Sequence, residues 1–310
     1  MCKLLAIIDI ENEDNALEFS ELAVKPMTAK DDDGLGVILM GDQGLGVERW
    51  LVPTDFPSPK ILSPKLSKFS ALLPARYNSE GETTQGNLYA LGIHSRNATT
   101  PKCLANVHPF VREGIALIHN GVISNHKDFK KEVSTCDSEA LLSLYLANGV
   151  KERFENVQKV CDEATGWYAF MVFDPAAKSL TIVKDDTTHL YLAHIPTVGI
   201  VFCTSDEIIK GVTGRMKLPQ ADIFEFPKDT AMRWVQGAAK IETLDILSAP
   251  IYTGFGWQEE KPGEEKSILD VSDGKVFCEH SIKKGTWCRE CYQLMGADYP
   301  EYLAVFRGKK

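Results

Sequence analysis

The stretch that decides the fold is MCKLLAIIDI, residues 1–10, in which a cysteine directly precedes an apolar run. Residues 3–10 are almost all aliphatic and have the length of a strand, which is typical of a strand buried on both faces. Because such a strand is held by neighbours on both sides, we expect Cys2 to lie in a fixed place at the edge of the core.

Cys2 could also carry chemistry. Removal of Met1 would leave a thiol and a free α-amine on the same residue. An α-amine titrates at roughly 7.7 to 8.0, so near neutral pH it can accept the thiol proton without a histidine partner. A small residue after an initiator methionine is also common, so the position alone does not separate a nucleophile from an ordinary second residue.

Composition limits the class of protein. With 310 residues, 44% hydrophobic and 25% charged, the chain has room for one large domain and a small appendage. No segment approaches the roughly 18 to 20 apolar residues of a membrane helix, and no basic and apolar leader opens the chain. We therefore expect a cytoplasmic protein without membrane partners, whose eight cysteines are reduced. A net charge of -9 argues against nucleic acid as a partner.

The order of predicted elements indicates the fold class. A helix is expected at 14–25, strands at 34–40, 46–52, 88–94 and 114–119, two helices between 138 and 163, and a succession of strands joined by short turns from 166 to 227. Strands, then helices, then strands predict an α+β fold, a four-layer αββα sandwich of two antiparallel sheets with the helices outside.

Four polar clusters follow Cys2 along the chain, each expected at a strand end or a helix start: residues 94–100, 106–109, 119–121 and 137–139. A thiol that cleaves an amide needs donors for a tetrahedral oxyanion, and the Asn120 side chain with the Gly121 N–H supplies two. A free amino acid is selected by a guanidinium for its carboxylate and a carboxylate for its ammonium, which Arg96 and Asp137 could provide.

Together with Cys2, these clusters resemble the motifs of the class II glutamine amidotransferases, which are N-terminal nucleophile (Ntn) hydrolases that take ammonia from glutamine. The resemblance covers roughly residues 2–240 and implies a glutaminase domain of the Ntn-hydrolase type over residues 2–246. The matching segments are Arg96 to Thr100, Asn106 to Pro109, His119 to Gly121, Asp137 to Glu139, Gly166 to Ala169 and Thr204 to Asp206. The chain departs from the family at Asn97, where an aromatic residue is usual, and at Pro101, where glycine is common.

The resemblance implies a role for six residues. Three would be catalytic: Cys2 as the nucleophile, with its freed amine as the base, and Asn120 with the Gly121 N–H as the oxyanion hole. Three would bind L-glutamine: Arg96 its carboxylate, Asp137 its ammonium, and Thr99 by ordering the loop that closes over it. For His94 and His119 we favour structural hydrogen bonding over catalysis.

Residues 247–310 differ in composition from the rest and are interpreted as a linker followed by a small extension. A Cys-x-His pair and a Cys-x-x-Cys pair have spacings that suit a tetrahedral, structural zinc site in a zinc-knuckle-like fold. No organic cofactor is expected. The predicted ligands are Cys278, His280, Cys288 and Cys291.

Two classes of function stay open at this stage. The leading one is a glutaminase that forms a thioacyl-enzyme at Cys2 and delivers ammonia to a separate synthetase subunit. The alternative is a non-catalytic binding or assembly protein that keeps Met1 and docks through the zinc knuckle. Hydrolysis of another amide is a third reading, but Arg96 with Asp137 favours an α-amino acid.

Overall fold

The computed structural model describes residues 2–29, 33–42, 44–51, 76–77, 83–84, 87–97, 101–147, 154, 156–238 and 241–246. Within them the chain forms two large antiparallel sheets. The first has the order β13 (Ile223–Glu225), β11 (Tyr191–Ile195), β12 (Gly199–Cys203), β1 (Lys3–Ile8), β6 (Leu88–Arg96), β2 (Gly34–Gly41) and β3 (Gly44–Trp50). The second has the order β15 (Glu242–Asp245), β14 (Thr230–Val235), β10 (Ser179–Lys184), β9 (Gly166–Asp174), β8 (Ile115–Ile123) and β7 (Phe110–Arg112). A short hairpin pairs β4 (Arg76–Tyr77) with β5 (Thr83–Thr84).

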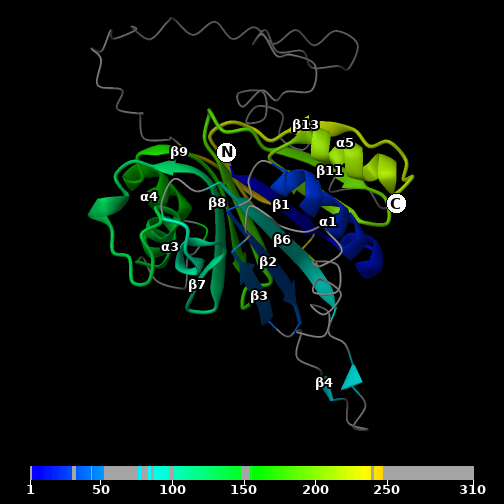
Figure 1. The fold of residues 1–310 in the computed structure, drawn as a ribbon, viewed down its shortest axis with the longest axis horizontal. Helices are drawn as coiled ribbons and strands as arrows, with labels where there is room; N and C mark the ends of the chain where they lie inside the picture. Colours follow the sequence, from blue (N-terminus) through cyan, green and yellow to red (C-terminus); the bar gives the residue numbers. More distant parts are fainter. Residues whose placement is uncertain are drawn as a thin grey trace, which may run out of the picture.

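Helices cover the outer face of each sheet. Helices α1 (Glu13–Thr28) and α5 (Asp206–Arg215) lie on one side, and α3 (Ser138–Ala147) and α4 (Asn156–Glu163) on the other, with the strands between them (Figure 1). Two 3₁₀ turns, η2 (Leu104–Asn106) and η3 (His126–Asp128), lie in the connections. Separate apolar clusters fill the space between the sheets and beneath each helix pair. The predicted sandwich of two antiparallel sheets with outer helices is confirmed.

Strand β1 shows why the first apolar run decides this arrangement. Leu5 and Ile7 pack toward α1 and α5, whereas Leu4, Ala6 and Ile8 pack between the sheets. All five side chains are fully buried. A strand with two buried faces needs apolar residues at every position, which is what the run supplies.

The structure differs from the sequence prediction in the length of two strands and in one helix. Strand β6 continues to Arg96 and β8 to Ile123, so Asn120 and Gly121 lie inside a strand and not at its end. Helix α5 forms where a short turn between strands was expected. It starts after Ser205 and buries the side chains of Ile208, Ile209, Val212 and Thr213.

Several expectations fall on residues outside the described ranges. Thr99 is one of them, and the extension 247–310 with its four predicted zinc ligands is another. Among the described residues, no group of three or more side chains is placed to hold a metal ion. None of the described helices is long and apolar enough to cross a bilayer.

Candidate active site

Cys2 precedes the central strand β1, which pairs with β12 on one side and β6 on the other. Two hydrogen bonds of 3.1 Å tie Leu4 to Thr204: the Leu4 N–H donates to the Thr204 hydroxyl, and the Thr204 N–H donates to the Leu4 carbonyl. The Asn97 N–H donates to the Cys2 Sγ at 3.3 Å. The thiol is therefore held beside the end of β6, as the sequence predicted for a residue at the edge of the core.

A cavity of about 340 Å³ opens at this thiol. Five of the six residues assigned a role from the sequence line it together: Cys2, Arg96, Asn120, Gly121 and Asp137. Seven further lining residues were given no role in the site by the sequence reasoning: Asn97, His108, His119, Val122, Cys136, Ser138 and Trp167. Five of the seven lie within the motifs, and Val122 and Cys136 lie directly beside one, so the motifs pointed to all seven.

The backbone of β8 and β9 forms one wall of the cavity. Asn120 is paired with Ala169, and Gly121 with Tyr168, in the ladder between these strands. Gly121 has φ +150°, and a Cβ there would lie 2.1 Å from the Trp167 carbonyl oxygen. Only glycine fits this position. The backbone of Asn120 and Gly121 is thus fixed by the sheet, which is the preorganisation that an oxyanion site needs.

Arg96 is the last residue of β6 and is 3% exposed. Its Nη2 donates to the Pro101 carbonyl at 3.4 Å. A guanidinium is charged at any physiological pH and presents a planar fork that matches a carboxylate. This side chain places a permanent positive charge on the cavity wall.

Asp137 lies directly before α3 and accepts the Ile123 N–H at 2.8 Å and the Ser138 N–H at 3.0 Å. Burial by itself would raise the pKa of its carboxyl, but the hydrogen bonds from the Ile123 N–H and the Cys136 thiol favour the ionised form, and that pKa is lowered below its ordinary value. The carboxylate is therefore ionised at neutral pH. It supplies the negative charge that an ammonium group requires.

Three buried histidines cluster at the cavity, and two of them, His108 and His119, line it. The rings of His94 and His108 stack with their centroids 3.8 Å apart, and His119 follows at 6.4 Å from His108. A nitrogen of His94 lies 2.9 Å from the His119 carbonyl oxygen, and His119 Nδ1 lies 2.8 Å from the Ser138 hydroxyl. Burial lowers the pKa of both His108 and His119, so these rings are neutral at pH 7. The hydrogen bonds of His94 and His119 agree with the structural role predicted for them, although His119 also reaches the cavity.

A polar network holds the segment that leads to Asp137. The Glu139 carboxylate accepts the backbone N–H groups of Glu132, Val133 and Ser134 at 2.7, 3.1 and 2.8 Å, and the Ser134 hydroxyl at 2.6 Å. Sequence reasoning quoted Glu139 as part of a motif but gave it no role. Its four acceptor contacts show that it fixes the loop before the helix.

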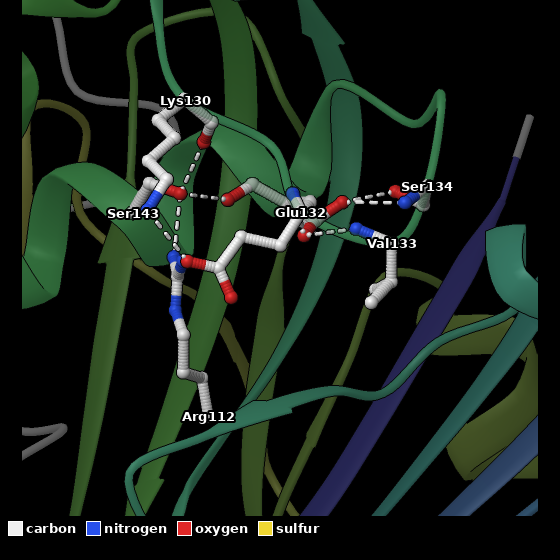
Figure 2. A network of polar contacts seen from close by, with 7 residues as sticks. Arg112, Lys130, Glu132, Val133, Ser134 and Ser143 are labelled. Carbon is white, nitrogen blue, oxygen red and sulfur yellow. Dashed lines mark hydrogen bonds and ion pairs between the residues drawn. The ribbon is translucent and has the colours of Figure 1, made fainter.

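The same network continues on the outside of the loop. Figure 2 shows Arg112 and Lys130 reaching Glu132, at 3.3 and 2.9 Å, and Ser143 of α3 between Arg112 and Lys130. The segment 130–134 is therefore joined both to β7, through Arg112, and to α3, through Ser143.

Residues 94–210 match the family model described as a glutamine amidotransferase domain. The resemblance to glutamine amidotransferases that the motifs indicated is confirmed over this range. The matched range begins at His94 and includes the clusters around Arg96, Asn120 and Asp137. Strand β1 and Cys2 precede it.

Curated relatives of this amidotransferase domain include two enzymes named glutamine–fructose-6-phosphate aminotransferase (isomerizing). The one from Treponema pallidum (strain Nichols) is 30% identical over 154 residues, which is 45% of this chain and 24% of that protein. The one from Campylobacter jejuni is 33% identical over 123 residues, which is 36% of this chain and 18% of that protein. The chain thus spans about a quarter or less of the length of these relatives.

Two solved structures share the fold of the amidotransferase domain. The glutamine phosphoribosylpyrophosphate amidotransferase of B. subtilis matches 79% of this chain and 49% of its own, with a TM-score of 0.56 at 15% identity. A structure described as the allosteric regulatory enzyme of purine biosynthesis matches 81% of this chain and 50% of its own, with a TM-score of 0.58 at 15% identity. Both likenesses support the two-sheet fold.

Proposed function

We propose that the domain hydrolyses the side-chain amide of L-glutamine through a thioacyl-enzyme at Cys2. The Cys2 sulfur forms a bond with the amide carbon, and the carbonyl oxygen becomes an oxyanion that accepts from Asn120 and the Gly121 N–H. When the oxyanion collapses, the C–N bond breaks and ammonia leaves with the proton that the thiol gave up. Water then cleaves the thioester to give glutamate and the free thiol.

The base in this proposal is the α-amine of Cys2, which exists only after Met1 is removed. Its ordinary pKa of roughly 7.7 to 8.0 allows it to take the thiol proton and return it to the leaving nitrogen. His108 and His119 line the same cavity, but burial lowers the pKa of both rings, which makes them weaker bases than the amine. The amine therefore remains our candidate for proton transfer.

One observation carries the proposal: a single cavity places the Cys2 thiol, the Asn120–Gly121 wall and the pair of charges Arg96 and Asp137 together. A neutral amide substrate would need no such pair. An α-amino acid carries a carboxylate and an ammonium at one end, which Arg96 and Asp137 complement. These charges favour glutamine over an amide without α-substituents.

The experiment compares L-glutamine with glutaric acid monoamide, which lacks the α-ammonium. We expect glutamate release from L-glutamine and at least tenfold lower kcat/KM for the analogue, because Asp137 loses its charged partner. Intact mass should show the loss of Met1. A protein that keeps Met1 and releases no glutamate would favour the alternative, a binding or assembly role.

We also propose that the ammonia passes to a separate acceptor enzyme. The matched relatives are named glutamine–fructose-6-phosphate aminotransferases, a name that pairs glutamine with a second substrate. A partner isolated with the full chain should raise the rate of glutamine hydrolysis or incorporate nitrogen from amide-labelled glutamine. A rate and product unchanged by every co-purifying protein would count against a partner.

A structural zinc ion at Cys278, His280, Cys288 and Cys291 is a further proposal from the sequence. Metal analysis of protein purified without chelator should give one zinc per chain. Cys288→Ser with Cys291→Ser should lose the metal, whereas Cys161→Ser, at a buried cysteine of α4, should keep it. Protein without zinc would remove this proposal and leave the glutaminase unaffected.

A further inference from the structure

We propose that Asn106 is a positioning residue that sets the distance between Arg96 and Asp137, and so determines how the site recognises the α-amino acid end of its substrate. This inference rests on the proposed function. It concerns a residue that does not line the cavity.

Asn106 is 1% exposed and uses its whole amide group to bridge two segments. Its Nδ2 donates to the Pro101 carbonyl at 3.0 Å and to the Thr135 hydroxyl at 2.9 Å. Its Oδ1 accepts the Thr135 N–H at 2.9 Å. Both N–H groups and the carbonyl oxygen of one side chain thus connect residue 101 with residue 135.

Each of these segments leads to one of the two charges. The Pro101 carbonyl also accepts from Arg96 Nη2, at 3.4 Å. Thr135 lies two residues before Asp137 on the loop that Glu139 holds from the other side. The path from Arg96 through Pro101, Asn106 and Thr135 therefore joins the guanidinium to the carboxylate through a single side chain.

The backbone around Asn106 is the fixed part of this bridge. The segment after it crosses β2 at two glycines: a Cβ on Gly36 would lie 1.8 Å from the His108 carbonyl oxygen, and one on Gly34 would lie 2.7 Å from Val107. Val107 is fully buried, and its carbonyl accepts from Arg49 at 3.4 Å. Residues 101–103 and 129–137 have no strand ladder of their own, so the two segments are what Asn106 holds in place.

This role differs in a measurable way from a contribution to folding alone. Loosening the bridge changes the spacing of Arg96 and Asp137 but leaves Cys2, Asn120 and Gly121 on their strands. Reactions that use the α-amino acid groups should therefore weaken, whereas the reactivity of the thiol itself should not. A general loss of stability would change both.

The experiment uses Asn106→Ala and Asn106→Asp, with Asn125→Ala as the matched control. Asn125 makes the same kind of bridge, donating to the Glu163 carbonyl at 2.8 Å and accepting the Thr165 N–H at 2.9 Å, and neither partner lines the cavity. Asn106→Asp keeps the acceptor for the Thr135 N–H, and its second oxygen can accept from the Thr135 hydroxyl, but it cannot donate to Pro101, so it isolates the half of the bridge that reaches the arginine segment.

Two alkylating reagents separate recognition from reactivity. A diazoketone analogue of glutamine carries the α-carboxylate and α-ammonium, whereas iodoacetamide carries neither. For both Asn106 variants we expect a rise in the glutamine KM of about tenfold, with kcat within about threefold of wild type. Inactivation by the diazoketone should slow by a similar factor at low reagent concentration, and alkylation by iodoacetamide should keep its rate. Asn125→Ala should leave all four quantities within about twofold.

Thr135→Val tests the bridge if the Asn106 variants do not fold, because it removes only the hydroxyl contact; it should raise KM about threefold. Equal slowing of both reagents, a fall in kcat at constant KM, or the same effects in Asn125→Ala would overturn the positioning role. Failure of the proposed function has a different signature. It would appear in the wild type, as no glutamate release and no preference for the diazoketone.

Discussion

The two ends of the cavity are built by different means. At the end where the amide would react, Asn120 and Gly121 lie within β8, and Cys2 lies one residue before β1, so ladder hydrogen bonds place them. At the other end, Asp137 stands in a loop that depends on single side chains, chiefly Asn106 and Glu139. Changes at the first end should therefore act on the reaction step, and changes at the second on substrate binding.

Cys2→Ala tests the reacting end and should have the largest effect. Without the sulfur no thioacyl-enzyme can form, so glutamate release should fall by roughly four orders of magnitude or more. A partly buried thiol at the start of a strand contributes little packing, and the free energy of unfolding should change by less than about 1 kcal/mol. Glutamate release and denaturant unfolding measure the two quantities. Full activity in this variant would end the proposal for the nucleophile.

Asn120→Ala tests whether the Asn120 side chain, on the cavity wall formed by β8, stabilises the oxyanion of the transition state. Loss of one oxyanion donor should lower kcat by about 10²- to 10³-fold. The glutamine KM should stay within about threefold, because Asn120 does not contact the α-amino acid groups in this proposal. Steady-state kinetics of the purified variant give both values. A rise in KM at constant kcat would instead move Asn120 to the recognition end.

Asp137→Ala tests the recognition end. Removing the partner of an ammonium costs about 2 to 4 kcal/mol, so the glutamine KM should rise by about 30-fold or more. Asp137→Asn serves as the control for the loop, because its amide oxygen can still accept the Ile123 N–H that the carboxylate binds now. Both variants should lose affinity if the charge matters. A wild-type KM in Asp137→Asn would show that Asp137 serves only to hold the loop.

The contrast between the two ends also explains what the sequence could predict. The uninterrupted apolar run in β1 predicted a strand with two buried faces, and the motifs predicted five residues that line one cavity. The bridge from Asn106 to Thr135 could not be predicted, because it joins residues 29 positions apart and two of its three hydrogen bonds use backbone atoms that any residue carries. Helix α5 was missed because its buried side chains lie within a segment of ten residues between two strands.

Glu139→Gln should have the smallest effect and tests how far the recognition end depends on one carboxylate. Burial would raise the pKa of Glu139, but the hydrogen bonds from Ser134, Glu132 and Val133 outweigh it and lower that pKa below 4.5. The ionised form therefore stabilises the fold fully above pH 4.5, and this contribution is lost as the pH falls through the lowered value.

A glutamine side chain offers one acceptor oxygen in place of two, so Glu139→Gln should lower the free energy of unfolding by about 1 to 2 kcal/mol at pH 7 and raise KM about threefold. Urea unfolding between pH 3 and pH 7 should show the difference from wild type shrinking toward the acid end. Glu132→Gln is the matched control, since its 43% exposed carboxylate makes solvent-screened ion pairs with Arg112 and Lys130, and its loss should change stability less than Glu139→Gln does. If both variants lose the same stability and the same affinity for glutamine, the loop before Asp137 is held by the whole polar network. The recognition end would then not depend on single side chains, and it would differ less from the β8 end than we propose.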